Sequence, residues 1–159
     1  MQLMESGWMM FQYLVSALAT GATVVMYEGS PLKRAESMWE TIDDLGVTVF
    51  GTSAKYIEQI SVRLSNISLH STDYLQKHYP DVKSKHSLST LRQILSTGSP
   101  LPPQLFDFVY QNIKSDVLLG SITGGTDICS VFAGRTTSLP VYRGEIQARM
   151  LGLYVQVLS

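Results

Sequence analysis

The sequence is poor in the side chains that build metal centres and disulfide frameworks. Its 159 residues include one cysteine, Cys129, and three histidines. A single thiol excludes an internal disulfide and any zinc or iron–sulfur site with several thiolates, so we expect a reducing, cytosolic compartment. The apolar context of Cys129 predicts a buried, inert thiol. The histidines, His70, His78 and His86, all fall in one polar segment, where we expect no metal site.

Charged residues are also scarce, and neither sign dominates. The 12 Lys and Arg residues balance 13 Asp and Glu residues, which leaves a formal net charge of −1. Nucleic-acid binding relies on clustered cations that displace counterions from phosphates, so this balance argues against a nucleic-acid partner. Motifs of several enzyme classes are missing too: there is no phosphate-clamping P-loop, no dinucleotide-binding glycine pattern and no Gly-x-Ser-x-Gly nucleophile elbow.

Residues 6–27 contain no Asp, Glu, Lys or Arg and are mostly apolar. A run of that length could cross a bilayer, which takes about 20 residues. Gly21 divides the run, however, and the β-branched residues after it favour a strand. We therefore expect a buried helix over 8–20 and a buried strand over 22–27, with no membrane span. A membrane anchor or a signal peptide is the alternative, although Glu5 stands where a secretory signal carries a cation.

Apolar periodicity predicts that helices and strands alternate along the rest of the chain. With 45% hydrophobic residues, the chain has enough apolar surface for the core of one domain. The expected helices are 38–45, with Leu45 on its apolar face and Gly46 at its end; 53–64, with Ser53 as N-cap; and one opened by Pro102 and Pro103. The expected strands are 47–50, 91–96 and 117–121.

This alternation predicts an α/β domain with a layered, largely parallel sheet and flanking helices. Two further segments, 144–150 and 153–158, predict a short antiparallel β addition towards the C-terminus. The polar residues 65–90 interrupt the rhythm and predict a loop.

Two polar loops follow neighbouring strands of the expected sheet. Ligands of open parallel sheets bind beyond the carboxyl ends of the strands, where loops, backbone amides and helix N-termini meet. The first loop, 96–101, has a glycine that lets a flat ligand approach the main chain, although an ordinary strand-to-helix turn explains the same composition. The second, 121–127, offers the amides of its Gly-Gly pair, a Thr126 hydroxyl suited to a phosphate oxygen and an Asp127 carboxylate suited to magnesium. Its alternative is a loop in which Asp127 caps a following helix.

Several blocks of the sequence together resemble the large N-terminal domain of the adenylate-forming acyl-CoA synthetases, and most closely the acetoacetyl-CoA synthetases among them. The blocks that carry the resemblance are 7–10, 18–22, 27–31, 94–101, 118–128 and 139–149. Their most specific part is Gly-Gly-Thr-Asp-Ile followed by Gly-Glu-Ile-Gln-Ala-Arg. The resemblance implies ligation of acetoacetate to coenzyme A in two steps: ATP and the acid give an acyl-adenylate and pyrophosphate, and coenzyme A then displaces AMP.

The resemblance also implies roles for individual positions. The positions that would contact the nucleotide are Gly98, Ser99, Pro100, Ser121, Ile122, Thr123, Gly124, Gly125 and Thr126. The positions that would line the acyl pocket are Trp8, Met9, Met10, Thr97 and Gly124. Thr126, near the α-phosphate, and Asp127, where most relatives help to hold Mg²⁺ with a glutamate, would be the catalytic residues. Relatives that accept acetate have a tryptophan at position 124, so the glycine implies room for the two extra carbons of acetoacetate.

The resemblance implies one part of a larger enzyme. Residues 1–159 match a single, partial AMP-binding domain, whereas the family's phosphate loop, ribose-binding aspartate, catalytic lysine and small C-terminal domain have no counterpart in the sequence. Because positive charge at the phosphoryl group is a main source of transition-state stabilisation, we do not expect adenylation by this chain alone. The alternatives are a related short-chain acyl-CoA ligase and a non-catalytic form that binds nucleotide or a partner protein. Strands without neighbours would also favour self-association through the sheet edges.

Overall fold

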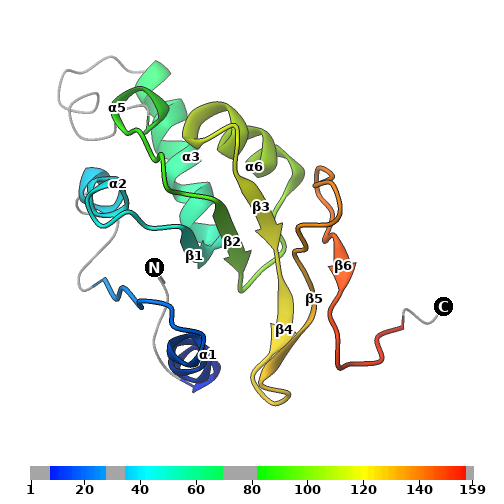
Figure 1. Ribbon diagram of the computed structural model, residues 1–159. Helices are drawn as coiled ribbons and strands as arrows, with labels where there is room; N and C mark the ends of the chain where they lie inside the picture. The colour runs from blue at the N-terminus through cyan, green and yellow to red at the C-terminus, as the bar shows by residue number, and fades with distance from the viewer. Residues whose placement is uncertain (1–7, 28–34, 70–81, 157–159) are drawn as a thin grey trace.

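Three short parallel strands form the centre of the fold (Figure 1). The strands, in spatial order, are β1 (Val49–Ser53), β2 (Gln93–Thr97) and β3 (Leu118–Ser121). Their register aligns Phe50 with Ile94 and Ile94 with Leu119. Parallel neighbours need crossover connections, and helices supply them here. The structure, a computed structural model that describes residues 8–27, 35–69 and 82–156, therefore confirms the predicted α/β class.

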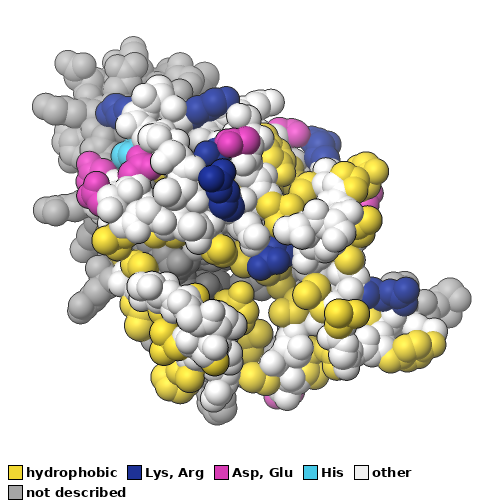
Figure 2. Space-filling view, viewed as in Figure 1, with side chains coloured by type: hydrophobic (Ala, Val, Ile, Leu, Met, Phe, Trp, Pro, Cys, Tyr) yellow, Lys and Arg dark blue, Asp and Glu magenta, His cyan; other side chains and the backbone are white. Residues whose placement is uncertain are grey.

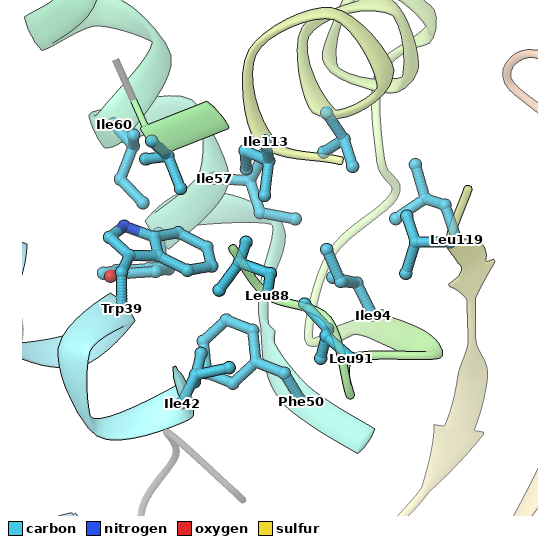
Figure 3. Packing of buried hydrophobic residues seen from close by; sticks show 14 of the residues in the cluster. Trp39, Ile42, Phe50, Ile57, Ile60, Leu88, Leu91, Ile94, Ile113 and Leu119 are labelled. Carbon is cyan, nitrogen blue, oxygen red and sulfur yellow. The ribbon is translucent and has the colours of Figure 1, made fainter. Parts of the chain in front are cut away.

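Helices and the parallel sheet together enclose one hydrophobic core (Figure 3). The helical elements that contribute to it are α2 (Ala35–Asp44), α3 (Ala54–Leu69), α5 (Val82–Lys85), α6 (Pro103–Phe108) and the π-helical turn η1 (Val109–Ile113). On the sheet, Phe50, Ile94 and Leu119 are at most 1% exposed. The indole of Trp39 packs edge-on against the Phe50 ring, with 5.7 Å between ring centroids. These in-register side chains tie each strand to the helices above it.

Local sequence signals set the ends of the helices. The Ser53 hydroxyl accepts a hydrogen bond from the Tyr56 N–H at 3.1 Å, so it caps α3 as predicted. Gly46 follows α2 with a φ of +61°, a left-handed conformation that glycine adopts without steric cost. Helix α1 (Trp8–Ala19) stops in the same way before Gly21, whose φ is +78°. Three of the predicted caps are thus confirmed.

A small antiparallel sheet continues from the end of β3. Its strands, in spatial order, are β4 (Thr123–Gly125), β5 (Ser130–Gly134) and β6 (Ala148–Arg149). The predicted antiparallel addition exists, but the sequence analysis missed β4 and β5, and residues 153–156 form no strand. Leu151 and Tyr154 are 96% and 86% exposed, so the apolar pattern near the C-terminus has no core surface to pack against.

The prediction of a buried helix and a buried strand over 8–27 is half wrong. Helix α1 forms, but Phe11 and Leu18 are 54% and 57% exposed. Residues 22–27 contain only an isolated bridge at Met26 instead of a strand. A cavity of about 480 Å³ lies between residues 22–25 and β1, so the β-branched side chains of this segment line a hollow.

Smaller boundary errors have local causes. Leu45 is 59% exposed because α2 already ends at Asp44. Helix α3 continues to Leu69 and α5 begins at Val82, so the predicted loop over 65–90 is partly helical. Strands β1 and β2 each start two residues later than predicted.

Some predicted features lie outside the described residues, namely the block at Gly7, residues 28–31 and 70–81, and with the last segment His70 and His78. The imidazole Nδ1 of His86 lies 3.7 Å from the Asp43 carboxylate, which also accepts hydrogen bonds from two backbone N–H groups. In the described part of the chain, no helix is both long enough and apolar enough to cross a membrane.

We expect Leu119→Ala to lower the free energy of unfolding by about 2–5 kcal/mol, because it opens a cavity in a fully buried site. Leu151→Ala is the matched control: its side chain is 96% exposed, and its effect should stay within about 0.5 kcal/mol. Urea unfolding followed by circular dichroism measures both. Equal losses in the two variants would contradict the described core.

Candidate functional site

A cavity of about 290 Å³ lies where α1, the parallel sheet and the antiparallel sheet meet. Helix α1 contributes Met9, Met10 and Tyr13; β1 and β2 contribute their carboxyl-terminal halves; and the β4–β5 hairpin closes the far side. Figure 2 shows this face hollowed between α1 and the antiparallel sheet, with hydrophobic side chains gathered over both. The cavity therefore has the location expected for a ligand site in an open parallel sheet.

Most of the positions that the sequence assigned to a site converge on this cavity. Those that line it are Met9, Met10, Thr97, Gly98, Ile122, Gly124, Gly125 and Thr126. Gly98 directly follows β2 with a φ of +87°, which a residue with a side chain would adopt only under strain. The expectation that the two loops follow neighbouring strands is confirmed, since β2 pairs with β3, and residues of both loops line this one cavity.

Other predicted site residues lie apart from the cavity lining. Ser99 and Pro100 are exposed beyond the end of β2, Ser121 is buried within β3, and Thr123 is exposed at the start of β4. Trp8 is the first residue of α1, but its side chain is not among those that the structure describes. The acyl positions are thus brought together more completely than the nucleotide positions.

Thr126 and Asp127 lie at the tip of the β4–β5 hairpin. Thr126 accepts a hydrogen bond on its carbonyl oxygen from the Cys129 N–H at 3.0 Å, which closes the turn. Both side chains are exposed, and no helix follows, so the alternative in which Asp127 caps a helix is wrong. Cys129 is exposed with a φ of +45°, which corrects the prediction of a buried thiol: a residue in a tight hairpin turn has no core to enter.

The carboxylate of Asp127, the predicted magnesium ligand, belongs to no cluster of three metal-binding side chains in the described part of the chain. Among the described residues, no three His, Cys, Asp or Glu side chains come together as a group that could hold a metal ion. Magnesium needs only one or two protein carboxylates when substrate phosphates supply further oxygens. Asp127 therefore fits a metal that arrives with a nucleotide and does not fit a metal held by the protein alone.

Gly124 is required by the hairpin. A Cβ atom at this position would lie 2.4 Å from the Ser130 carbonyl oxygen and 3.1 Å from the Val131 Cα. The glycine therefore allows the backbones of β4 and β5 to approach at the register shift between Thr123 and Gly124. A Cβ at this position would point at the β5 backbone, so the hairpin gives this glycine a structural role, and its role in the length of an acyl pocket stays a prediction.

The lining residues that sequence reasoning missed include Tyr13, Arg135 and Met150. Tyr13 follows Met9 and Met10 by four and three residues, so helical periodicity could have found it. Arg135 packs against Gly120 of β3, and Met150 bonds to Phe132 of β5; no local sequence pattern indicates either of these contacts. Two buried polar atoms of the cavity residues, Thr52 Oγ1 and Arg135 Nε, have no hydrogen-bond partner among the residues described.

Hydrogen bonds of two side chains, Arg143 and Gln147, hold the segment 139–147 in place. Arg143 forms a two-pronged ion pair with Asp107 on α6, with Nε 2.9 and 2.8 Å from the two carboxylate oxygens. The hydrogen bond to this carboxylate raises the pKa of the Arg143 guanidinium. The Gln147 amide donates to the Leu139 carbonyl and accepts from the Thr136 N–H. The Gly-Glu-Ile-Gln-Ala-Arg block thus has a structural role through Gln147, in addition to providing strand β6.

Comparison with known proteins decides the family. The family model described as AMP-binding enzyme matches residues 2–157. The chain belongs to the AMP-binding enzyme family. Within it, the chain is 49% identical over 155 residues to acetoacetyl-CoA synthetase from Danio rerio and 42% identical over 162 residues to malonamoyl-CoA synthetase from Penicillium aethiopicum.

Part of the solved structure of acetoacetyl-CoA synthetase from Streptomyces lividans has the same fold as this chain. The two share a TM-score of 0.75 and 36% identity over 95% of the chain. The match covers 22% of the Streptomyces protein, and the matches to the Danio and Penicillium proteins cover 97% and 94% of this chain but 21% of each relative. The chain thus spans about a fifth of the length of these relatives.

We expect Gly124→Ala to destabilise the domain by about 1–3 kcal/mol, because the new methyl group would force β4 and β5 apart. Gly125→Ala is the neighbouring control: its Cβ would meet no atom closer than 3.7 Å, and its effect should stay below about 1 kcal/mol. Thermal unfolding and hydrogen exchange at the Val131 amide measure the loss. Similar behaviour of the two variants would refute the close approach at position 124.

Proposed function

We propose that this chain supplies the acyl pocket and one wall of the nucleotide pocket of a ligase that joins a short acid to coenzyme A through an acyl-adenylate. One observation carries the proposal. Residues assigned by family resemblance to the acid and to the nucleotide line a single cavity at the carboxyl ends of parallel strands. In such a ligase the carboxylate and the α-phosphate must meet, so a shared cavity is what the chemistry requires.

In this proposal the Gly98 backbone lies against the adenine ring, and the Thr126 hydroxyl donates to an oxygen of the α-phosphate. Asp127 contributes a carboxylate oxygen to Mg²⁺, which would arrive with ATP and neutralise phosphate charge. A carboxylate oxygen of the acid attacks the α-phosphorus, and pyrophosphate leaves. The sulfur of coenzyme A then attacks the acyl carbon, and AMP leaves.

We propose acetoacetate as the acid. The names of the relatives point to acetoacetyl and malonamoyl groups, and both acyl groups carry a carbonyl oxygen on the third carbon. A related short-chain acid is the alternative. Since the chain spans about a fifth of these relatives, we propose that it binds ligands but does not complete the reaction alone. A cytosolic location and self-association through the outer strands β1 and β3 belong to the same proposal.

A thermal-shift titration of the chain with AMP and with Mg²⁺–ATP tests the nucleotide half of the proposal, since a ligand that binds the folded state raises its melting temperature. We expect a saturable rise, equivalent to about 2.7 kcal/mol at a ligand concentration of 100 times the Kd. Thr126→Ala should abolish most of it. Thr137→Ala, an exposed position in the loop after β5, should leave it unchanged.

Two results would overturn the proposal. A folded chain whose melting temperature ignores both nucleotides would show that the cavity is no nucleotide half-site. An equal rise in the Thr126 and Thr137 variants would show that nucleotide binds elsewhere. Capture of a protein partner without any nucleotide response would favour the non-catalytic alternative.

A further inference from the structure

Arg135 brings a positive charge to the wall of a largely apolar cavity. The residue directly follows β5, and its side chain crosses the sheet at Gly120, where a Cβ atom would lie 2.7 Å from the Arg135 Cβ. Glycine at position 120 therefore leaves the space that the arginine stem occupies. The side chain lines both the 290 Å³ cavity and the neighbouring 480 Å³ cavity, so it stands between them.

Among the described residues that line the two cavities beside Arg135, none is acidic. None of the described side chains that line the smaller cavity is an aspartate or a glutamate, and Met9, Met10, Leu95 and Met150 make much of the wall apolar. The Arg135 Nε is buried and has no hydrogen-bond partner among the described residues. A guanidinium keeps its charge at any ordinary pH, and a buried donor without an acceptor is costly. The cavity is thus built to receive an oxygen acceptor.

We propose that Arg135 determines acid specificity by donating hydrogen bonds to an oxygen on the third carbon of the acyl chain. This inference rests on the proposed acyl site formed by Met9, Met10 and Thr97, which lines the same cavity as Arg135. The substrate class is then short 3-oxo acids and acids with another carbonyl oxygen at that carbon. A plain aliphatic acid of the same length would leave the guanidinium unpaired, and sites built around a hydrogen bond reject such analogues strongly.

A phosphate oxygen of the nucleotide is the competing acceptor, because arginine pairs well with phosphates. The residues that line the cavity distinguish between an acyl oxygen and a phosphate oxygen as the acceptor. Methionines surround the part of the cavity that α1 forms, and such side chains suit an acyl chain better than a phosphate. An acyl oxygen is therefore the acceptor that the observations favour, and the nucleotide serves as a control ligand in the test.

The test compares acetoacetate, butyrate and AMP as separate ligands of the whole 159-residue chain, by calorimetry and thermal shift. Acetoacetate and butyrate have the same number of carbons and differ by the oxygen on the third carbon. The unsubstituted chain should bind acetoacetate at least about tenfold more tightly than butyrate, the size of one hydrogen bond to a charged group. Arg135→Met should remove this preference by weakening acetoacetate alone, and Arg135→Lys should restore part of it.

Two further variants complete the test: the first is a control, and the second displaces Arg135 without replacing it. Arg149→Met removes an exposed arginine of β6 that bonds to the Val155 carbonyl outside the cavity, and it should keep the preference. Gly120→Ala pushes the arginine stem aside without changing charge, and it should reduce the preference even if Arg135→Met fails to fold. Melting curves identify which variants are folded.

Each outcome decides between the two proposals. Loss of AMP binding in Arg135→Met, with the acid preference intact, would assign the guanidinium to phosphate and overturn the inference. An acid preference that Arg135→Met and Gly120→Ala both leave unchanged, or no preference in the unsubstituted chain, would also overturn it. If AMP fails to bind while an Arg135-dependent acid preference persists, the nucleotide proposal fails and the inference stands.

Discussion

The in-register pairing of three parallel strands is the constraint on which the rest of the structure depends. Parallel register makes all three strands end at one edge, so the chain leaves β2 at Thr97 and β3 at Ser121 side by side. The two polar loops, which are more than twenty residues apart in sequence, meet only because of this edge. If β2 and β3 slipped by one residue, buried and cavity-facing side chains would exchange faces.

The same register gives the two faces of the sheet different tasks. The row formed by Phe50, Ile94 and Leu119 is almost completely buried against the helices and holds the domain together. The next row, Gly51, Leu95 and Gly120, faces the other way. Its glycines leave space above the sheet, and Gly51 and Leu95 line the cavity. The core row therefore packs on one face of the three short strands, whereas Gly51 and Leu95 line the cavity from the other face; Thr52, on the face of Phe50, also reaches the cavity.

The sequence predicted the parts of this arrangement that depend on short-range patterns. Periodicity located α1, α2, α3 and the helix after Pro103, and the caps at Ser53 and Gly46 were visible because their chemistry is local. The β4–β5 hairpin was missed because its strands are short and their burial does not alternate from residue to residue as in a half-buried strand. Arg135 was missed because its place on the cavity wall depends on its approach to Gly120 of β3, a contact between residues that are distant in the sequence.

Two glycines, Gly120 and Gly124, lead to an argument about how the proposed acid site would select its substrate. At Gly124 the missing side chain allows two strands to approach each other, which is a structural reason for the glycine apart from the predicted size of the acid pocket. At Gly120 the missing side chain admits the stem of a charged residue. Volume alone separates homologous acids by only about 1–3 kcal/mol, whereas an unpaired polar group in the site penalises the wrong ligand far more. If the cavity holds the acid as proposed, its selectivity depends on the oxygen that Arg135 can bind, and the length of the pocket matters less.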